Sequence, residues 1–286
     1  MIENIVRFEF LQNAFLTGIM IGFLAPFLGV FIVVRRLSLI ADALSHITLA
    51  GIAAGLLIQA KVAFVTAFNP LYTALLFSVI GSLLIEKLRS LYASFQELSI
   101  PIILSGGIGL SVIFISLANG FNQDLFYYLF GSINAISRSD MWTVFAILIV
   151  VSSVLVFLYK ELVFLSFDEE HAKASGMPTK KVHFVFIVIV ALVIAASMRI
   201  VGIMLVSALM TLPVATSIRI AKGFKETIVL SIVFGELAVV GGLVAAYYLE
   251  LPSGGTIVMV SIALLCIVLL WKKVKLMFVA KTAQID

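Results

Sequence analysis

The stretch RRLSLIADALSHITLAGIAAG, residues 35–55, starts with two arginines and continues as an apolar run that contains Asp42 and His46. A run of this length and hydropathy predicts a helix that crosses a membrane, with the arginines at one end. Burying a carboxylate and an imidazole at that depth costs several kcal/mol unless something compensates. The pair therefore points to a function inside the membrane.

The composition of the whole chain agrees with a membrane protein. Of its 286 residues, 63% are hydrophobic and only 12% are charged, against about 25% charged residues in soluble domains. The long segments that contain no Asp, Glu, Lys or Arg include 10–34, 62–85, 141–159 and 251–271. These runs are continuous rather than alternating, which favours transmembrane helices over strands. The sequence predicts an all-α, polytopic transmembrane helical bundle.

The apolar periodicity predicts eight or nine spans within one transmembrane domain, residues 1–286. The expected spans are 13–34, 40–60, 70–86, 101–118, 141–160, 183–198, 200–218, 227–249 and 255–271. The span 200–218 is short and contains Pro213. With nine spans, fifteen of the 19 Lys and Arg residues fall on one side, which places that side in the cytoplasm and the amino terminus outside.

Two connections have a distinctive composition. The cytoplasmic segment SFDEEHAKASGMPTKK, residues 166–181, predicts a short polar helix whose acidic residues favour its amino end and which Gly176 and Pro178 terminate. We expect His171 and His183, which flank it, to be solvated or interfacial. The outer segment 119–140 is amphipathic and aromatic, and it predicts a short surface or re-entrant helix.

Asp42 and His46 are four residues apart, so they share one face of a helix. At about 1.5 Å per residue they lie about 9 and 15 Å from Arg36, between the inner interface and the bilayer centre. Both groups bind divalent transition metals, and the hydroxyls of Ser45 and Thr48 are near in sequence. The competing interpretation is a purely structural Asp–His hydrogen bond.

Two ligands make a weak metal site, but a symmetric dimer would supply two carboxylates and two imidazoles. Glu236, in SIVFGELAVVGG, is the other acid inside a predicted span, and it is a further candidate for the metal pathway. The sequence contains neither G-x-x-x-x-G-K-[ST] nor H-E-x-x-H, so no catalytic residue is predicted. Energy for transport must then come from a partner or from an ion gradient.

Several stretches together resemble the permease subunit of zinc and manganese ABC importers. The resemblance covers nearly the whole chain and keeps the order of its motifs. It rests on RRLSLIADALSHITLAGIAAG, LFYYLFGSINAISRSD (125–140), FDEEHAKASGMP (167–178), IVGIMLVSALMTLPVATSIRIA (200–221) and LPSGGTIV (251–258).

This resemblance implies a type II ABC importer-like permease in a bacterial cell membrane. It implies two permease copies, two cytoplasmic ATP-binding subunits that carry the ATP, and an extracellular or periplasmic metal-binding protein. Asp42 and His46 would contact the transported ion. The partner ATPase would contact the coupling segment, at Asp168, Glu169, Glu170, Ala172 and Gly176.

The ligand set admits zinc, manganese or ferrous iron, and residues 125–140 look closer to zinc members, so zinc is preferred over manganese here. No covalently bound cofactor is expected. Two alternatives stay open at this point: a proton-coupled secondary metal carrier, and an ABC permease for a metal chelate or corrinoid.

Overall fold

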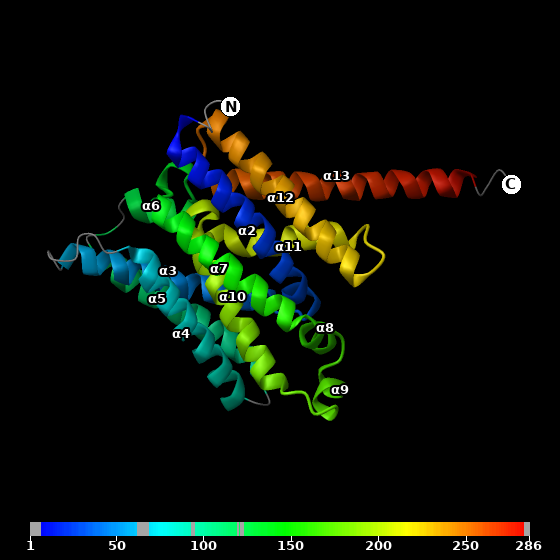
Figure 1. Cartoon of the computed structure of the whole chain (residues 1–286), viewed down its shortest axis with the longest axis horizontal. Coiled ribbons are helices and arrows are strands. Elements are labelled where there is room, and N and C mark those ends of the chain that lie inside the picture. The colour runs from blue at the N-terminus through cyan, green and yellow to red at the C-terminus, as the bar shows by residue number, and fades with distance from the viewer. Residues whose placement is uncertain (1–6, 62–68, 93–94, 119, 121–122, 283–286) are drawn as a thin grey trace.

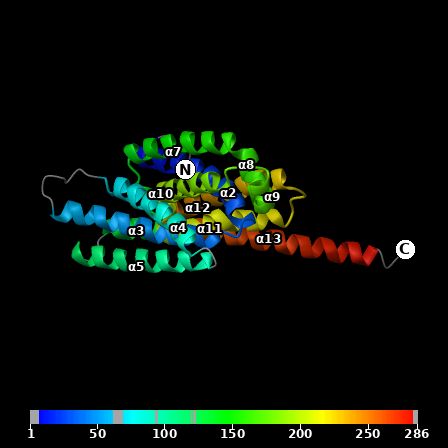
Figure 2. The ribbon, with the colours of Figure 1, turned by 90° about the horizontal axis from the view of Figure 1, so that it is seen from below.

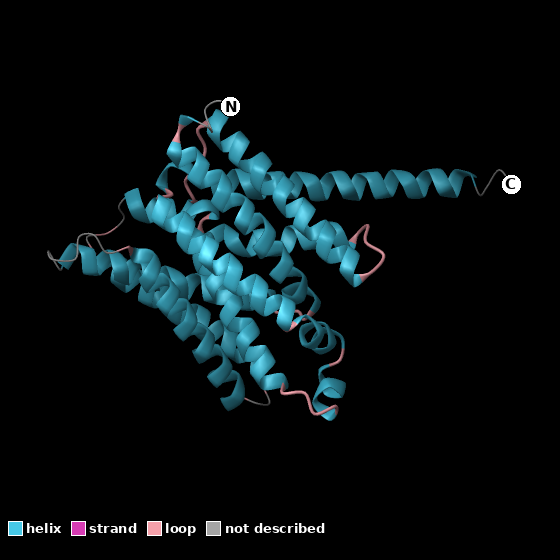
Figure 3. Cartoon of the chain, in the orientation of Figure 1, coloured by secondary structure: helices cyan, strands magenta, loops and turns pink. Residues whose placement is uncertain are grey.

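The computed structural model describes residues 7–61, 69–92, 95–118, 120 and 123–282, and those residues form helices joined by loops (Figure 3). This confirms the predicted all-α bundle. The α-helices are α2 (Glu9–Val34), α3 (Ser38–Lys61), α4 (Pro70–Leu91), α5 (Ser99–Leu117), α6 (Gln123–Phe130), α7 (Arg138–Phe157), α8 (Tyr159–Phe167), α9 (Glu169–Ala174), α10 (Thr179–Val201), α11 (Ile203–Ile218), α12 (Phe224–Leu249) and α13 (Ser253–Thr282).

Eight of these helices are long and apolar enough to cross a membrane: α2, α3, α4, α5, α7, α10, α12 and α13. The helix α11 is shorter, but it also joins the two sides. It follows Arg199, which pairs with Asp140 at the outer end of α7, and it precedes Arg219, whose carbonyl accepts from Lys272 on the cytoplasmic side. The described region therefore contains eight helices with the length and composition of a membrane span, and α11 is the short ninth candidate among the eight or nine predicted spans.

The helices form a bundle with a buried centre and two lipid-accessible faces. Helices α2, α3 and α10 are the most buried of the long helices, whereas α5 and α7 are largely exposed and lie on opposite sides of the bundle (Figure 2). The carboxyl-terminal half of α13 projects beyond the other helices (Figure 1). Exposed apolar side chains on these faces suit contact with lipid or with another membrane subunit.

Glycines allow the helices to approach closely where small residues recur at four-residue spacing. A Cβ on Gly51 would lie 2.7 Å from the Thr73 carbonyl oxygen of α4. A Cβ on Gly18 would lie 2.7 Å from the Leu243 side chain of α12. Gly51 therefore needs glycine for close packing against the α4 backbone, whereas at Gly18 the leucine side chain would have to shift.

Several helix boundaries differ from those expected; α13, for example, extends to Thr282 rather than ending at 271. Two of the differences have a cause in the core. The predicted span 141–160 ends early, because α7 stops at Phe157 and α8 starts a separate helix that buries Leu162 and Leu165 against the core. The helix α10 starts at Thr179 rather than at 183. In both places core contacts, rather than local hydropathy, set the boundary.

The outer segment forms the short helix α6 and the 3₁₀ turn η3 (Ile133–Ala135); residues 119, 121 and 122 of that segment lie outside the described residues. Gly131 (φ +78°) and Gly202 (φ +79°) shape the contact between this segment and the α10–α11 turn. An added Cβ at either glycine would meet backbone atoms of the other segment. The glycines therefore hold α6 against the outer end of α10.

Candidate functional site

Asp42 and His46 form a narrow accessible stripe along α3. From Ile40 to Ala53, every residue of α3 is buried except these two, which are half-buried. Their four-residue spacing puts them one above the other on the same face. The rich Ala and Leu content of α3 favours a regular helix, so the helix itself fixes their relation. Within residues 40–53, only the helix face that carries Asp42 and His46 is accessible.

The side chains of this stripe are free to bind a ligand. In the described part of the chain, no hydrogen bond joins the side chains of Asp42 and His46, which disfavours a self-contained structural pair. The nearby hydroxyls are not part of the accessible stripe, because Ser45 and Thr48 are buried and donate back to the Ala41 (2.8 Å) and Leu44 (2.5 Å) carbonyls.

The helix α5 fixes the position of this part of α3. Ser111 Oγ donates to the His46 carbonyl oxygen at 3.2 Å. Gly107 lies so close that an added Cβ would be 2.9 Å from the Ile47 backbone nitrogen. The backbone around His46 is therefore anchored, while its ring and the Asp42 carboxylate remain accessible.

One protomer does not gather a larger cluster of metal ligands. Among the described residues, no group of three or more His, Cys, Asp or Glu side chains could hold a metal ion. Glu236 lies on α12 against α2, where a Cβ on Gly22 would be 3.1 Å from its Oε2. The main neighbours of α12 are α2, α11 and α13, and those of α3 are α4, α5, α10 and α11, so Glu236 does not join Asp42 and His46 in one described ligand cluster.

The predicted cytoplasmic helix is present as α9. Asp168 caps it by accepting from the backbone N–H of His171 (2.8 Å), and Gly176 (φ +80°) ends the segment. Glu169 pairs with Lys173 at 2.7 Å. That hydrogen bond lowers the pKa of Glu169 below its ordinary value. The segment is a preformed, charged projection on the cytoplasmic side.

The side chains of this segment face in two directions. Asp168, Glu169, Glu170 and Gly176 are exposed, but Ala172 is fully buried in the hydrophobic core. The expected contact of Ala172 with a partner is therefore not available in this conformation. Ala172 instead anchors the short helix to the bundle.

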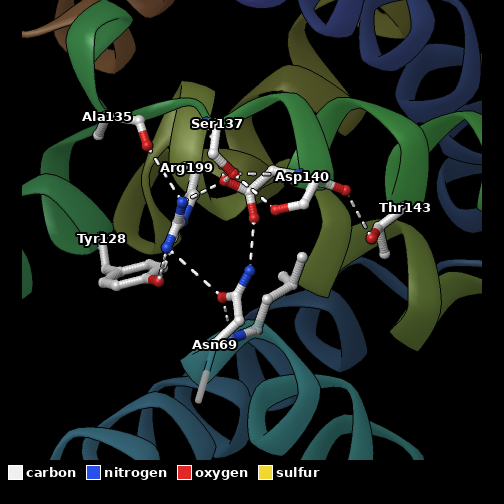
Figure 4. A network of polar contacts seen from close by, with 9 residues as sticks. Asn69, Tyr128, Ala135, Ser137, Asp140, Thr143 and Arg199 are labelled. Atoms are coloured by element: carbon white, nitrogen blue, oxygen red, sulfur yellow. Dashed lines mark hydrogen bonds and ion pairs between the residues drawn. The ribbon is translucent and has the colours of Figure 1, made fainter. Parts of the chain in front are cut away.

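A buried polar network joins four segments at the outer end of the bundle (Figure 4). Arg199, near the end of α10, forms an ion pair with Asp140. It also donates to the hydroxyl of Tyr128 (2.6 and 3.0 Å) and to the Ala135 carbonyl (3.1 Å). Asn69 donates to the second Asp140 carboxylate oxygen at 2.7 Å. Helices α4, α6, α7 and α10 are thus tied together.

Local capping positions these polar groups. Asn69 caps α4 by accepting from Leu71 N–H, and Ser137 and Asp140 form a capping box at the start of α7. Burial raises the pKa of Tyr128, which keeps its hydroxyl protonated beside the Asp140 carboxylate. Sequence reasoning missed this network, although Arg199 is a single cation between two apolar runs, and such a cation signals a buried partner.

The burial of His183 differs from the expectation. This residue is buried, only 8% exposed, rather than solvated or interfacial. Its Nδ1 lies 2.8 Å from an Arg35 Nη2. His171 is exposed, as expected.

Comparison with known proteins matches this architecture to a family. The ABC 3 transport family matches residues 7–272. The chain belongs to this family. It is a multi-pass permease of ABC-type metal transporters in the bacterial membrane, and it is the permease subunit rather than the ATPase.

Individual relatives align with this chain over most of their own length. The manganese import system permease protein ScaB of Streptococcus gordonii is 34% identical over 260 residues, covering 91% of this chain and 90% of that protein. The manganese transport system membrane protein MntC of Listeria monocytogenes is 31% identical, covering 100% of this chain and 99% of its own. The solved structure of PsaBC from Streptococcus pneumoniae in complex with Fab matches with a TM-score of 0.80 at 32% identity, covering 93% of each chain.

Proposed function

We propose that this permease imports Mn²⁺ by alternating access, powered by partner ATPase subunits. The observation that carries the proposal is the accessible stripe of Asp42 and His46 on an otherwise buried segment of α3. An ionisable pair held open inside a membrane helix is costly unless it serves a pathway. Among the described residues, no neighbour forms a hydrogen bond with the Asp42 carboxylate or the His46 ring, so their oxygen and nitrogen atoms are available as metal ligands.

A second permease copy completes the site in this proposal. One chain offers one carboxylate and one imidazole, which is too few ligands for a divalent ion. Two copies that face each other across a two-fold axis supply four ligands. An ion held by two copies is released when they move apart, which suits transport better than a closed four-ligand site within one chain. Glu236 lies apart from the pair and stays a secondary candidate for the pathway.

The proposed ion follows from ligand chemistry and from the relatives. A carboxylate with an imidazole suits manganese as well as zinc, and no thiolate is available to select zinc. Two relatives that match 91% and 100% of this chain are named for manganese. We therefore assign manganese rather than the zinc favoured by residues 125–140.

The partners are proposed on each side of the membrane. Two ATPase subunits dock on the exposed residues Asp168, Glu169, Glu170 and Gly176, because these form a charged projection on the cytoplasmic side. A metal-binding protein delivers the ion to the outer face. A secondary carrier would not need such a docking projection, which disfavours the proton-coupled alternative.

Reconstitution in liposomes tests this function. The permease and its co-purified ATPase are inserted in liposomes, and uptake of Mn²⁺ and Zn²⁺ is followed with ATP, without ATP and with an imposed proton gradient. The proposal predicts ATP-dependent Mn²⁺ uptake that Asp42→Asn and His46→Gln abolish. Uptake driven by the proton gradient alone would support the carrier instead.

A further inference from the structure

A polar cluster lies at the cytoplasmic end of the bundle, apart from the proposed metal ligands. It contains Arg35 from the end of α2, Glu86 and Arg89 from α4, and His183 from the first turns of α10. The guanidinium of Arg35 also lies over the ring of Phe186, 5.4 Å from its centroid. Three segments that are distant in sequence therefore meet at one buried imidazole.

His183 cannot satisfy all of its neighbours at once. Arg35 lies against Nδ1 at 2.8 Å, and the guanidinium of Arg89 lies against Nε2. Burial lowers the pKa of Arg35 to about 10, so its guanidinium stays protonated at neutral pH and only donates. A neutral imidazole has one acceptor nitrogen. It can therefore accept from Arg35 or from Arg89, but not from both.

The tautomer that accepts from Arg35 leaves the Nε2 proton facing Glu86. The distance from Nε2 to Glu86 Oε2 is 3.5 Å. Within the described residues, Arg35 Nη1 and Glu86 Oε2 are both buried without a hydrogen-bond partner. Buried polar atoms are nearly always hydrogen-bonded, so these two atoms leave a place for a second arrangement of the same groups.

This cluster is joined directly to the docking segment. The helix α9 leads through Gly176 into α10, and backbone hydrogen bonds from Gly176 to Lys173 and from Met177 to Ala172 hold that turn. Figure 1 shows α9 beside the amino-terminal end of α10. A displacement of α9 therefore moves the first turns of α10, which carry His183.

The cluster is also joined to the helix that carries Asp42 and His46. Arg35 lies three residues before Ser38, where α3 starts. Backbone hydrogen bonds from Leu37 to Ile32 and from Ile40 to Leu37 make the intervening turn a single unit with α3. A change in the position of Arg35 is therefore passed to the start of α3.

We propose that His183 is a positioning residue that accepts alternately from Arg35 and from Arg89, and thereby couples movement of the docking segment to α3. This inference rests on the proposed ATP-driven import. The state that holds Arg35 fixes α3 to α10, whereas the state that holds Arg89 fixes α4 to α10 and releases α3. Exchange between the two requires no new contact, only a change of tautomer and a small shift of the ring.

The test measures metal ions imported per ATP hydrolysed by the reconstituted permease–ATPase complex. Arg35→Gln removes the positive charge and shortens the side chain, so it weakens one of the two competing contacts to His183, and we expect the ratio to fall about tenfold while ATP hydrolysis continues. Arg35→Lys keeps the charge and one donor, and it should restore the ratio to within about threefold of wild type. The matched control is Arg36→Gln, which makes the same change at the exposed neighbouring residue and should leave the ratio unchanged.

A ratio for Arg35→Gln within about twofold of wild type would overturn the inference, because a coupling contact is expected to change it at least fivefold. If Arg35→Gln assembles poorly, His183→Gln and His183→Leu decide the question. Glutamine retains one acceptor and a donor, so its ratio should exceed that of leucine, and equal ratios would contradict the inference.

The two proposals fail in different ways. If the wild-type complex shows no ATP-dependent uptake, the proposed function is wrong. If wild type imports metal with ATP and the Arg35 and His183 variants retain the same coupling ratio as wild type, the positioning role alone is wrong.

Discussion

The outer network makes a quantitative prediction for Asp140→Asn. The Asp140 side chain is 3% exposed and pairs with Arg199, whose side chain is 20% exposed. The substitution removes the negative charge but preserves the volume and one acceptor. Breaking a buried ion pair by neutralising one partner costs about 3–5 kcal/mol, because the other charge stays buried.

We expect the lower end of this range, about 3 kcal/mol, because Arg199 still donates to Tyr128 and to the Ala135 carbonyl. Such a loss lowers the unfolding midpoint by roughly 6–12 °C in a chain of this size. The measurement is equilibrium and thermal unfolding of the purified permease in detergent.

The exposed ion pair between Glu9 and Arg138 provides a matched control. Its atoms lie 3.3 Å apart, and its side chains are 63% and 68% exposed. Glu9→Gln should change the free energy of unfolding by about 0–1 kcal/mol. If Asp140→Asn were as mild as Glu9→Gln, the network would not stabilise the outer end, and the reasoning would be refuted.

Three further predictions concern packing and the docking segment. Gly29→Ala should destabilise the protein, because the added Cβ would collide with the Met210 carbonyl. Gly106→Ala places its Cβ in open space and should stabilise its helix by up to about 1 kcal/mol. Unfolding in detergent compares the two variants. Asp168→Ala should cost α9 about 1 kcal/mol and weaken ATPase binding, whereas Asp168→Asn keeps the cap and should bind normally. The pKa of Glu169 is lowered on folding, so its contribution is complete above its ordinary value of 4.5 and is lost as the pH falls through the lower folded value. ATPase affinity should therefore weaken in that acidic range, and Glu169→Gln should abolish that dependence.

Hydropathy and charge were sufficient to predict most of the fold. The continuous apolar runs determine the helices, and the uneven division of Lys and Arg determines their direction. Sequence also indicated the Asp42–His46 face, because spacing alone places residues i and i+4 together. The short helix α9 was predictable because its cap and its terminating glycine are local signals.

The features that sequence missed depend on contacts between distant segments. Nothing near Arg199 in the sequence identifies Asp140, 59 residues away, as its partner. His183 was expected to be solvated or interfacial because it flanks the polar cytoplasmic segment, but it is buried beside Arg35, which is 148 residues away in the sequence. The resemblance implied that Ala172 contacts the ATPase with the rest of the coupling segment, yet its single methyl group packs into the core.

The most direct test of the shared metal site uses mixed dimers. Wild-type and Asp42→Asn chains with different tags are co-expressed, and dimers that carry both tags are purified with the ATPase and reconstituted. If one ion is held by both copies, ATP-dependent Mn²⁺ uptake by the mixed dimer should fall close to that of the all-variant dimer. Uptake at about half of the wild-type rate would show that each copy carries its own pathway, and would contradict the account.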